Sequence, residues 1–299
     1  MLPGERRRSL NLNPGSKERN ETGMLLQAQL IAYWGAIIIY VITFIILVAG
    51  YVFQKEHVLA KTFLGTGLGL AFHTAGLGFR WAMVGHGPYV DFVEVVPADA
   101  WIAVVVLIAL QWKKPGLQVL GMFILPMVFM MLGFTVLLEQ SMESMPLTYS
   151  TVWLYIHVLF AKLAYGSCLV GAASGGLYLW KSSRGQGTKG LLGKIPSPDS
   201  LDELGYRFVA FAFIMLGVMI LTGAIWAHQS WGRYWGWDPI ETWALISWFV
   251  YGLILHLRFT LSWKGKRAAW LAIGGFFLVL FSYWATPFIY QTIHEHIVY

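Results

Sequence analysis

Residues 207–261, RFVAFAFIMLGVMILTGAIWAHQSWGRYWGWDPIETWALISWFVYGLILHLRFTL, decide the fold, because they hold two apolar runs joined by a short loop rich in tryptophan. The runs, 207–227 and 243–261, are each long enough to cross the ~30 Å hydrocarbon core of a bilayer as a helix. Between them lies the tryptophan loop (226–243), with tryptophans at positions 226, 231, 235, 237 and 243 around an Asp-Pro pair. Interfacial tryptophans are usually scattered. Their concentration here predicts a flat, rigid aromatic shelf that suits a large planar apolar ligand.

Apolar character extends over most of the chain. Of the 299 residues, 57% are hydrophobic and only 12% are charged, which excludes an ordinary soluble domain. We predict an all-α polytopic membrane protein, a bundle of about eight transmembrane helices with an outward-facing tryptophan loop. A polar N-terminal tail, 1–25, precedes the transmembrane domain, 26–299, and a Gly-, Ser- and Pro-rich inner loop covers 181–206. The expected crossings are 30–53, 58–84, 98–112, 116–138, 151–180, 207–227, 243–261 and 268–290.

Basic residues are divided unevenly between the two ends of the predicted bundle. If the tryptophan loop faces outward, the inner loops hold thirteen Lys and Arg residues, whereas the outer loops hold only Arg233. This is the positive-inside pattern, so the net charge of +6 reports topology and not nucleic-acid binding. One segment disagrees, because eight crossings put the N-terminus outside and residues 1–21 carry five basic residues. Either this tail is translocated despite its charge, or the first crossing is wrong.

The chain has one cysteine, Cys168, which lies among small residues of the fifth crossing and is expected to be a packing residue. Neither a disulfide nor a C-x-x-C zinc pattern can form. The chain also lacks C-x-x-C-H, so it cannot itself be a c-type cytochrome.

The spacing W-G-x-x-W-x-W-D-P-x-E-x-W, from Trp231 to Trp243, resembles the signature of the haem-handling protein family with the tryptophan-rich (WWD) motif. That family includes the cytochrome c biogenesis proteins CcsA (ResC), CcmC and CcmF. The stretch GFRWAMVGHGPYVDFVE at 78–94 is similar to a second feature of the CcsA type, and the order of features along the chain fits that type best.

The resemblance implies a holocytochrome c synthase (haem lyase) subunit that handles haem b. Such a subunit would move haem to the outer face of a bacterial plasma membrane or a thylakoid membrane. There it would present haem to apocytochrome c for covalent thioether attachment at C-x-x-C-H, together with a CcsB (ResB)-type membrane partner. No nucleic acid is expected among its partners.

Three histidines are the main candidates to hold the haem iron. His157 and His294 are expected at the outer face, at the start of the fifth crossing and just beyond the eighth. Two neutral imidazoles on opposite sides of the iron give a six-coordinate site. Position alone leaves two unrelated interfacial histidines equally open, and the resemblance implies that they are ligands, with His296 as the rival of His294. His256 lies within the seventh crossing, about 20 Å below the outer mouth, and the resemblance implies a ligand to haem in transit.

His73, deep in the second crossing, could face His256 across the bundle and complete a bis-histidine site in one chain. The resemblance instead implies that the partner of His256 comes from the CcsB-type subunit. Arg258 could meet a haem propionate, or it could be a snorkelling residue at the inner boundary.

The tryptophan loop supplies the other expected contacts with haem. Asp238 could cap the helix that begins at Pro239, could orient a ligand, or could do both, with Glu241 acting in the first turn of that helix. The side chains expected to cover the macrocycle are Trp231, Trp235, Trp237 and Trp243.

Three other functions remain open at this point. One is a CcmC-like haem chaperone without ligation activity. Another is a b-haem electron-transfer membrane subunit that would retain haem permanently between His73 and His256. The third is a transporter whose aromatic loop lies over some other flat ligand.

Overall fold

The computed structural model describes residues 14–140, 151–184 and 193–291, and this part of the chain consists of helices and connecting turns. The elements are α1 (Pro14–Val52), α2 (Glu56–Val84), α3 (Phe92–Lys113), the 3-10 turn η1 (Pro115–Leu120), α4 (Gly121–Leu137), α5 (Val152–Ser183), α6 (Pro198–Trp231), α7 (Pro239–Leu261), α8 (Lys266–Leu280), the π-helical turn η4 (Phe281–Ala285) and α9 (Thr286–Ile289). The predicted all-α class and the eight helical runs are confirmed. The third run is longer than expected, because α3 begins at Phe92 and carries Pro97 inside it.

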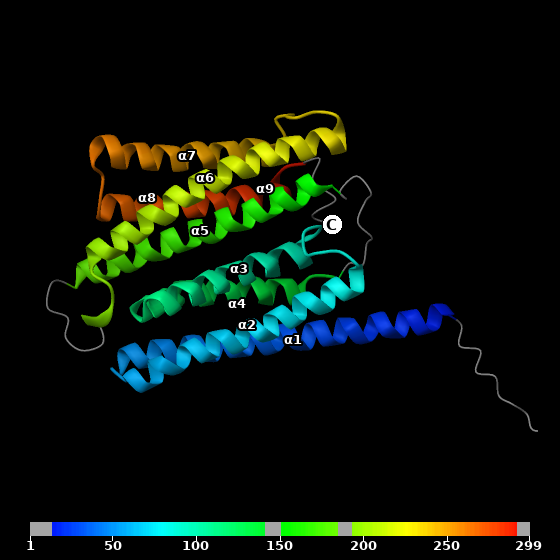
Figure 1. Cartoon of the computed structure of the whole chain (residues 1–299), viewed down its shortest axis with the longest axis horizontal. Coiled ribbons are helices and arrows are strands. Elements are labelled where there is room, and N and C mark those ends of the chain that lie inside the picture. Colours follow the sequence, from blue (N-terminus) through cyan, green and yellow to red (C-terminus); the bar gives the residue numbers. More distant parts are fainter. Residues whose placement is uncertain (1–13, 141–150, 185–192, 292–299) are drawn as a thin grey trace, which may run out of the picture.

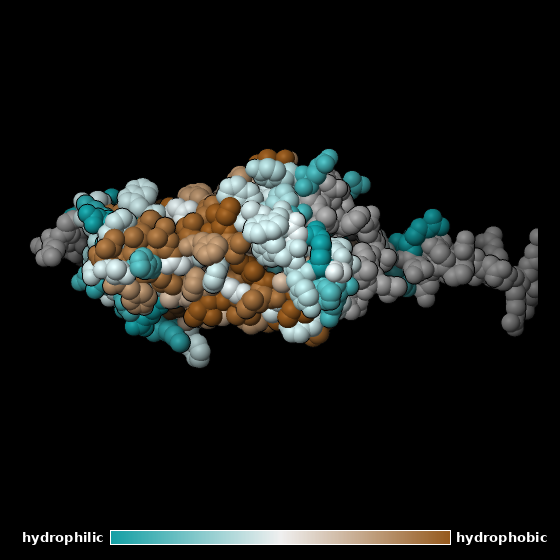
Figure 2. Space-filling model, turned by 90° about the horizontal axis from the view of Figure 1, so that it is seen from above, coloured by the Kyte–Doolittle hydropathy of each residue, from teal (hydrophilic) through white to brown (hydrophobic). Residues whose placement is uncertain are grey.

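Seven of the described helical segments are long and apolar enough to cross a membrane: Arg19–Val52, Phe92–Lys113, Pro115–Leu137, Val152–Ser183, Pro198–Trp231, Pro239–Leu261 and Lys266–Ala285. On the face shown in Figure 2, hydrophobic residues gather in the middle of the molecule and hydrophilic residues gather toward the two ends. This distribution fits a protein that spans a bilayer, with its polar ends in water.

The eighth long helix, α2, has 29 residues and lies beside α1 along its length (Figure 1). At 1.5 Å per residue it is about 43 Å long, which is enough to cross. Its glycines lower its hydropathy but let α1 approach closely. A Cβ placed on Gly69 would lie 2.4 Å from the ring of Tyr40, and one on Gly76 would lie 2.3 Å from Tyr33. Small residues at such helix contacts are typical of membrane bundles.

Successive helices run antiparallel, and α1 begins at the end of the bundle where the tryptophan loop joins α6 to α7 (Figure 1). We call this end of the bundle the tryptophan-loop end. The first predicted crossing is therefore present as a helix. An error in that prediction does not explain the basic N-terminal segment. Residues 1–13 themselves lie outside the described part of the chain.

Close packing along α5 fixes the core of the bundle. A Cβ on Gly171 would lie 3.7 Å from the carbonyl oxygen of Gly205 in α6, and one on Gly175 would lie 2.9 Å from the carbonyl oxygen of Ala269 in α8. Cys168 lies between these positions and is 1% exposed, which confirms that it is a packing residue. The small-residue stretch of α5 therefore brings both α6 and α8 against it.

Replacing Gly175 with Ala tests this packing. The added methyl group would meet backbone atoms of α8, which cannot move aside as a flexible side chain can, so we expect a loss of roughly 1–3 kcal/mol of stability. The measurement is the midpoint of thermal unfolding of the purified protein in detergent. Gly274→Ala is the matched control, because no atom lies within 4 Å of its added Cβ. Equal midpoints for the two variants would show that α5 and α8 are not in close contact.

Candidate functional site

A cavity lies below the tryptophan loop, enclosed by α3, α5, α6, the start of α7 and the turn η4. Its atom-free volume is about 1180 Å³, including the open mouth. Ligand pockets usually measure about 300–1,000 Å³, so the space suits a ligand of cofactor size. The lining is mainly apolar and aromatic. Among its polar groups, Tyr89 and Glu241 lie at the tryptophan-loop end, which we call the mouth, and His157 lies in the second turn of α5. Asp99 and Lys162 lie further along α3 and α5, at what we call the floor.

His157 lies in the second turn of α5 and reaches across to α6. Its Nδ1 lies 2.8 Å from the carbonyl oxygen of Met219, and its ring stacks on Trp226 with 6.1 Å between ring centroids and an interplanar angle of 18°. A carbonyl oxygen can only accept a hydrogen bond, so Nδ1 carries the proton and donates. In the neutral ring, Nε2 then keeps its lone pair, which is the tautomer that binds a metal through Nε2.

Gly223 makes this hydrogen bond possible. A Cβ at position 223 would lie 2.7 Å from Nδ1 and 2.8 Å from Cε1 of His157. Any side chain there would push the imidazole away from α6 and from the Met219 carbonyl. The contact between His157 and α6 therefore depends on the absence of a side chain at position 223.

The start of α7 is fixed by a capping box, so capping, one of the two roles open for Asp238, is present. The Asp238 carboxylate accepts from the backbone N–H of Ile240 at 3.0 Å. In return, the Glu241 carboxylate accepts from the backbone N–H groups of Asp238 and Gly236, at 3.2 and 2.8 Å. Both acidic side chains therefore order the loop backbone as it enters α7.

The tryptophans do not form the single flat shelf that we predicted. Trp235 lines the cavity, and its ring is at 88° to that of Trp237, which is 70% exposed. Trp231 packs edge-on against Trp226, which lines the cavity wall beside His157. Trp243 packs against Phe281 of η4 instead. The rings differ in direction because edge-to-face packing is more favourable than a coplanar sandwich and because each ring sits on a different turn of the backbone.

Two charged residues in the cavity escaped the sequence analysis. Lys162 of α5 lies 3.0 Å from the carboxylate of Asp99 in α3 and donates to the Val95 carbonyl at 3.2 Å. Both side chains are about nine-tenths buried. A signal was available, because ionisable residues inside predicted crossings are functional suspects by default. In the sequence analysis this principle was used for the histidines and not for Asp99 or Lys162.

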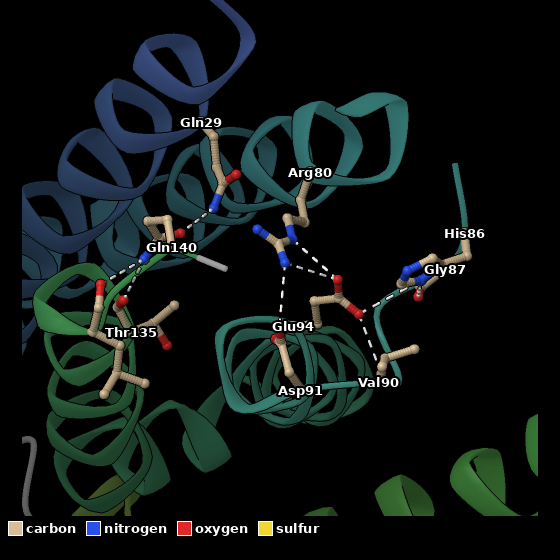
Figure 3. Close-up of polar contacts among 10 residues, drawn as sticks. Gln29, Arg80, His86, Gly87, Val90, Asp91, Glu94, Thr135 and Gln140 are labelled. Carbon is tan, nitrogen blue, oxygen red and sulfur yellow. Dashed lines mark hydrogen bonds and ion pairs between the residues drawn. The ribbon is translucent and has the colours of Figure 1, made fainter. Parts of the chain in front are cut away.

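A second polar cluster holds the turn that enters α3, and Figure 3 shows Arg80 of α2 pointing toward it. Arg80 is 1% exposed and binds Glu94 at 3.0 Å and Asp91 at 3.3 Å. Glu94 also accepts from the backbone N–H of Val90 at 3.1 Å. The cluster therefore fixes the position of Tyr89 at the wall of the cavity. Burial raises the pKa of the Tyr89 phenol to about 12, so this hydroxyl is protonated at neutral pH and can donate.

His73 and His256 are not brought together. His73 is fully buried, with Nε2 2.9 Å from the carbonyl of Pro97 and Nδ1 3.4 Å from the hydroxyl of Tyr40. His256 is exposed on α7, which lies on the opposite side of the bundle from α2 (Figure 1). The pairing of these two histidines within one chain is therefore wrong. Periodicity could not reveal this, because it does not show which helices are neighbours.

Arg258 binds Asp202 at the start of α6 with two hydrogen bonds, at 3.2 and 2.8 Å. Asp202 also accepts from the backbone N–H of Gly265, so the pair joins α6 to the turn between α7 and α8. Arg258 therefore helps to hold α6 against the turn between α7 and α8, at the end of the bundle opposite the tryptophan loop. The remaining predicted ligands, His294 and His296, lie outside the described residues.

Together, the fold and the cavity define an integral membrane protein with a large cavity below an aromatic loop at one end of its helical bundle. The family model described as cytochrome C assembly protein matches residues 89–294. The chain is 31% identical over 299 residues to the cytochrome c biogenesis protein CcsA of Guillardia theta, covering 93% of this chain and 94% of that protein. It is 32% identical over 245 residues to CcsA of Prochlorococcus marinus (strain NATL2A), covering 71% of this chain and 77% of that protein.

Among solved structures, the cytochrome c haem lyase CcmF has a similar fold, with a TM-score of 0.64 at 14% identity. The match covers 92% of this chain and 47% of CcmF, so the chain spans about half the length of that protein. At this identity the likeness concerns the fold alone. The family match and the relatives show that the chain belongs to the cytochrome c assembly protein family, as a member of the CcsA type, and that it functions in cytochrome c assembly.

Replacing Arg80 with Met tests the cluster that fixes Tyr89. The change would leave Glu94 and Asp91 without their buried cation, and removing one partner from a buried ion pair costs about 3–5 kcal/mol. We expect a clearly lower thermal midpoint in detergent than for Arg207→Met. The latter breaks a largely exposed pair with Glu203, which is worth less than about 1 kcal/mol. A similar midpoint for both variants would contradict a structural role of the cluster.

Proposed function

We propose that the cavity below the tryptophan loop binds haem b as substrate and presents it to apocytochrome c for covalent attachment. The observation that carries this proposal is the hydrogen bond from Nδ1 of His157 to the Met219 carbonyl. A backbone carbonyl in this position is the usual second partner of a metal-binding histidine, because it fixes both the tautomer and the orientation of the ring. His157 is thus prepared to bind haem iron through Nε2.

The cavity also fits the rest of a haem molecule. Its walls are mostly apolar and aromatic, with Trp226 and Trp235 beside and above His157, and its volume accommodates a flat ligand of that size. We assign His294 as the ligand on the other side of the iron, with His296 as its rival. A replaceable second ligand suits the function, since the histidine of the C-x-x-C-H peptide must take one coordination position for haem to leave.

The reaction needs no nucleophile from this chain. Each cysteine S–H of the C-x-x-C-H peptide adds across the C=C bond of a haem vinyl group, so that sulfur bonds to one carbon and the proton ends on the other. No electrons are gained or lost overall. The chain contributes position: His157 holds the iron, and the tryptophan loop places the vinyl edge near the thiols and excludes water. On this proposal the chain is a haem lyase subunit.

His256 fits a second haem site that this chain cannot complete alone. It lies in an exposed stripe of α7 with Phe249, which is 60% exposed, and Leu253, which is 53% exposed. Its Nδ1 lies 3.4 Å from the hydroxyl of Thr260, one turn further along α7, and a histidine on an otherwise apolar membrane face is costly unless it is well paired. We propose that a CcsB-type membrane partner covers this face and supplies the opposite ligand to haem in transit.

The distribution of basic residues supports the orientation of the bundle. The loops at the end opposite the tryptophan loop carry most of the Lys and Arg residues, which favours the cytoplasmic or stromal side for that end. The tryptophan loop would then face the periplasm or the thylakoid lumen. The CcsA relatives from Guillardia theta and Prochlorococcus marinus are consistent with either membrane.

Replacing His157 with Ala tests the proposed iron ligand. The variant should bind haem more weakly or in a five-coordinate form, and added imidazole should restore the six-coordinate visible spectrum by filling the vacant position. The measurement is the absorption spectrum of the protein purified with and without a CcsB-type partner. His73→Ala serves as the comparison, since its nitrogens bind Tyr40 and Pro97. An unchanged spectrum in the His157 variant would exclude this site.

Replacing Gly223 with Ala tests the positioning of His157 without removing it. The new methyl group should displace the imidazole and break its hydrogen bond to Met219, a loss of roughly 1 kcal/mol or several-fold in haem affinity. Gly78→Ala, which adds a methyl group in open space, should leave the affinity unchanged. Haem titration followed at the Soret band measures both, and equal affinities would count against the proposed role of the Met219 hydrogen bond.

Covalent attachment must be measured separately from binding. Co-expression with an apocytochrome c and a CcsB-type partner should give covalently bound haem with the wild-type chain and little with His157→Ala. If the wild-type chain binds haem but yields no covalent product, the function is that of a haem chaperone without ligation activity.

A further inference from the structure

We infer that Lys162 receives the propionate carboxylates of haem at the floor of the cavity and thereby turns the vinyl edge toward the tryptophan loop. This inference rests on the proposed function, since it assumes that haem enters the cavity. It adds a residue that determines the direction in which the substrate is held.

Depth is the first argument. Lys162 begins five residues further along α5 than His157, which is about 7.5 Å deeper in the bundle. Both residues line the same cavity, so a ligand whose iron lies at Nε2 of His157 extends toward the Lys162 ammonium group. The two propionates of haem b lie at the edge of the macrocycle opposite the two vinyl groups. One of these edges must therefore point to the floor and the other to the mouth.

Charge decides between the two edges. Among the described residues that line the cavity, Lys162 is the single Lys or Arg, whereas the mouth carries the carboxylate of Glu241. Propionates at the mouth would meet this negative charge with no lining Lys or Arg beside it, whereas propionates at the floor would meet the Lys162 ammonium group, whose charge is shared with the Asp99 carboxylate. Lys162 is about nine-tenths buried, and a charge-assisted hydrogen bond in such low-dielectric surroundings is stronger than one at the surface. The thiols of the apocytochrome arrive at the mouth, where the vinyl groups are then found.

The ion pair at the floor is prepared for such a ligand. Nζ of Lys162 donates to Oδ1 of Asp99 and to the Val95 carbonyl, and an ammonium group has three donors. Oδ2 of Asp99 is buried and has no hydrogen-bond partner in the described part of the chain. A buried carboxylate that accepts a hydrogen bond at only one of its two oxygens leaves the other oxygen without a donor, which is unfavourable. A water molecule that donates to both Oδ2 and an ionised propionate on Nζ would supply the missing donor.

Asp99 has a separate role in this arrangement. Before haem enters, its carboxylate balances the positive charge of the Lys162 ammonium group, because an unpaired charge inside the membrane is costly. Because it also competes for the ammonium group, its removal should strengthen the attraction of Lys162 for a propionate. This expected gain separates a ligand-binding role from a purely structural tie between α3 and α5.

The experiment compares haem with haem dimethyl ester, in which both propionates are neutral, by titration of the full-length protein in detergent at the Soret band. The wild-type chain should bind haem roughly tenfold more tightly than the ester, the effect of one charge-assisted hydrogen bond. The double variant Lys162→Met/Asp99→Asn, which leaves no lone buried charge, should bind both ligands equally. Asp99→Asn alone should increase the preference for haem. Arg233→Met, which removes a cation of the loop that does not line the cavity, should retain it.

Each other outcome overturns the inference. A double variant that still prefers haem, or a wild-type chain that binds both ligands equally, shows that no propionate reaches Lys162. Loss of the preference in Arg233→Met places the propionates at the loop. If the double variant does not fold, an unchanged or lowered preference in Asp99→Asn contradicts the inference by itself. A wild-type chain that binds neither ligand refutes the proposed function as well, which distinguishes the two failures.

Discussion

The close approach of α5 to its neighbours is the constraint on which the rest of the structure depends. Glycines at positions 171 and 175 let α6 and α8 lie against α5 with little more than backbone between them. At the tryptophan-loop end, the imidazole of His157 lies between the backbones of α5 and α6. There is room for it because position 223 has no side chain. The cavity opens where this close packing ends. Small residues thus determine both the tight half of the α5–α6 contact and the place where a ligand can enter.

Largely buried ion pairs occur at three places among the described residues, and each is tied to a particular position in the bundle. Arg80 and Glu94 fix the turn that carries Tyr89, Arg258 and Asp202 fix the opposite end of α6, and Lys162 with Asp99 forms the floor of the cavity. Such pairs are costly to bury and add little net stability compared with apolar residues of similar volume. The first two have structural tasks at helix ends. The third lies in the ligand cavity, where it faces the space that the substrate would occupy.

The sequence predicts the elements well because their signals are local. Hydropathy identified the eight runs, and the Asp-Pro pair followed by Glu241 indicated a helix start at which Asp238 could act as the cap. Contacts between distant segments were harder to predict. Asp99 and Lys162 are 63 residues apart in different crossings, and nothing local to either residue indicates the pair. His73 resembled a ligand because a buried histidine and an iron-binding histidine have the same sequence signal. Only the positions of Tyr40 and Pro97 show that both of its nitrogens are used.

An experimental structure of the haem-loaded protein, determined by electron cryomicroscopy, would test the central claim most directly. The account predicts density for a macrocycle in the cavity below the tryptophan loop. The iron should lie at coordination distance from Nε2 of His157, while Nδ1 keeps its hydrogen bond to the Met219 carbonyl. Density for haem elsewhere on the bundle, with this cavity free of a macrocycle, would contradict it.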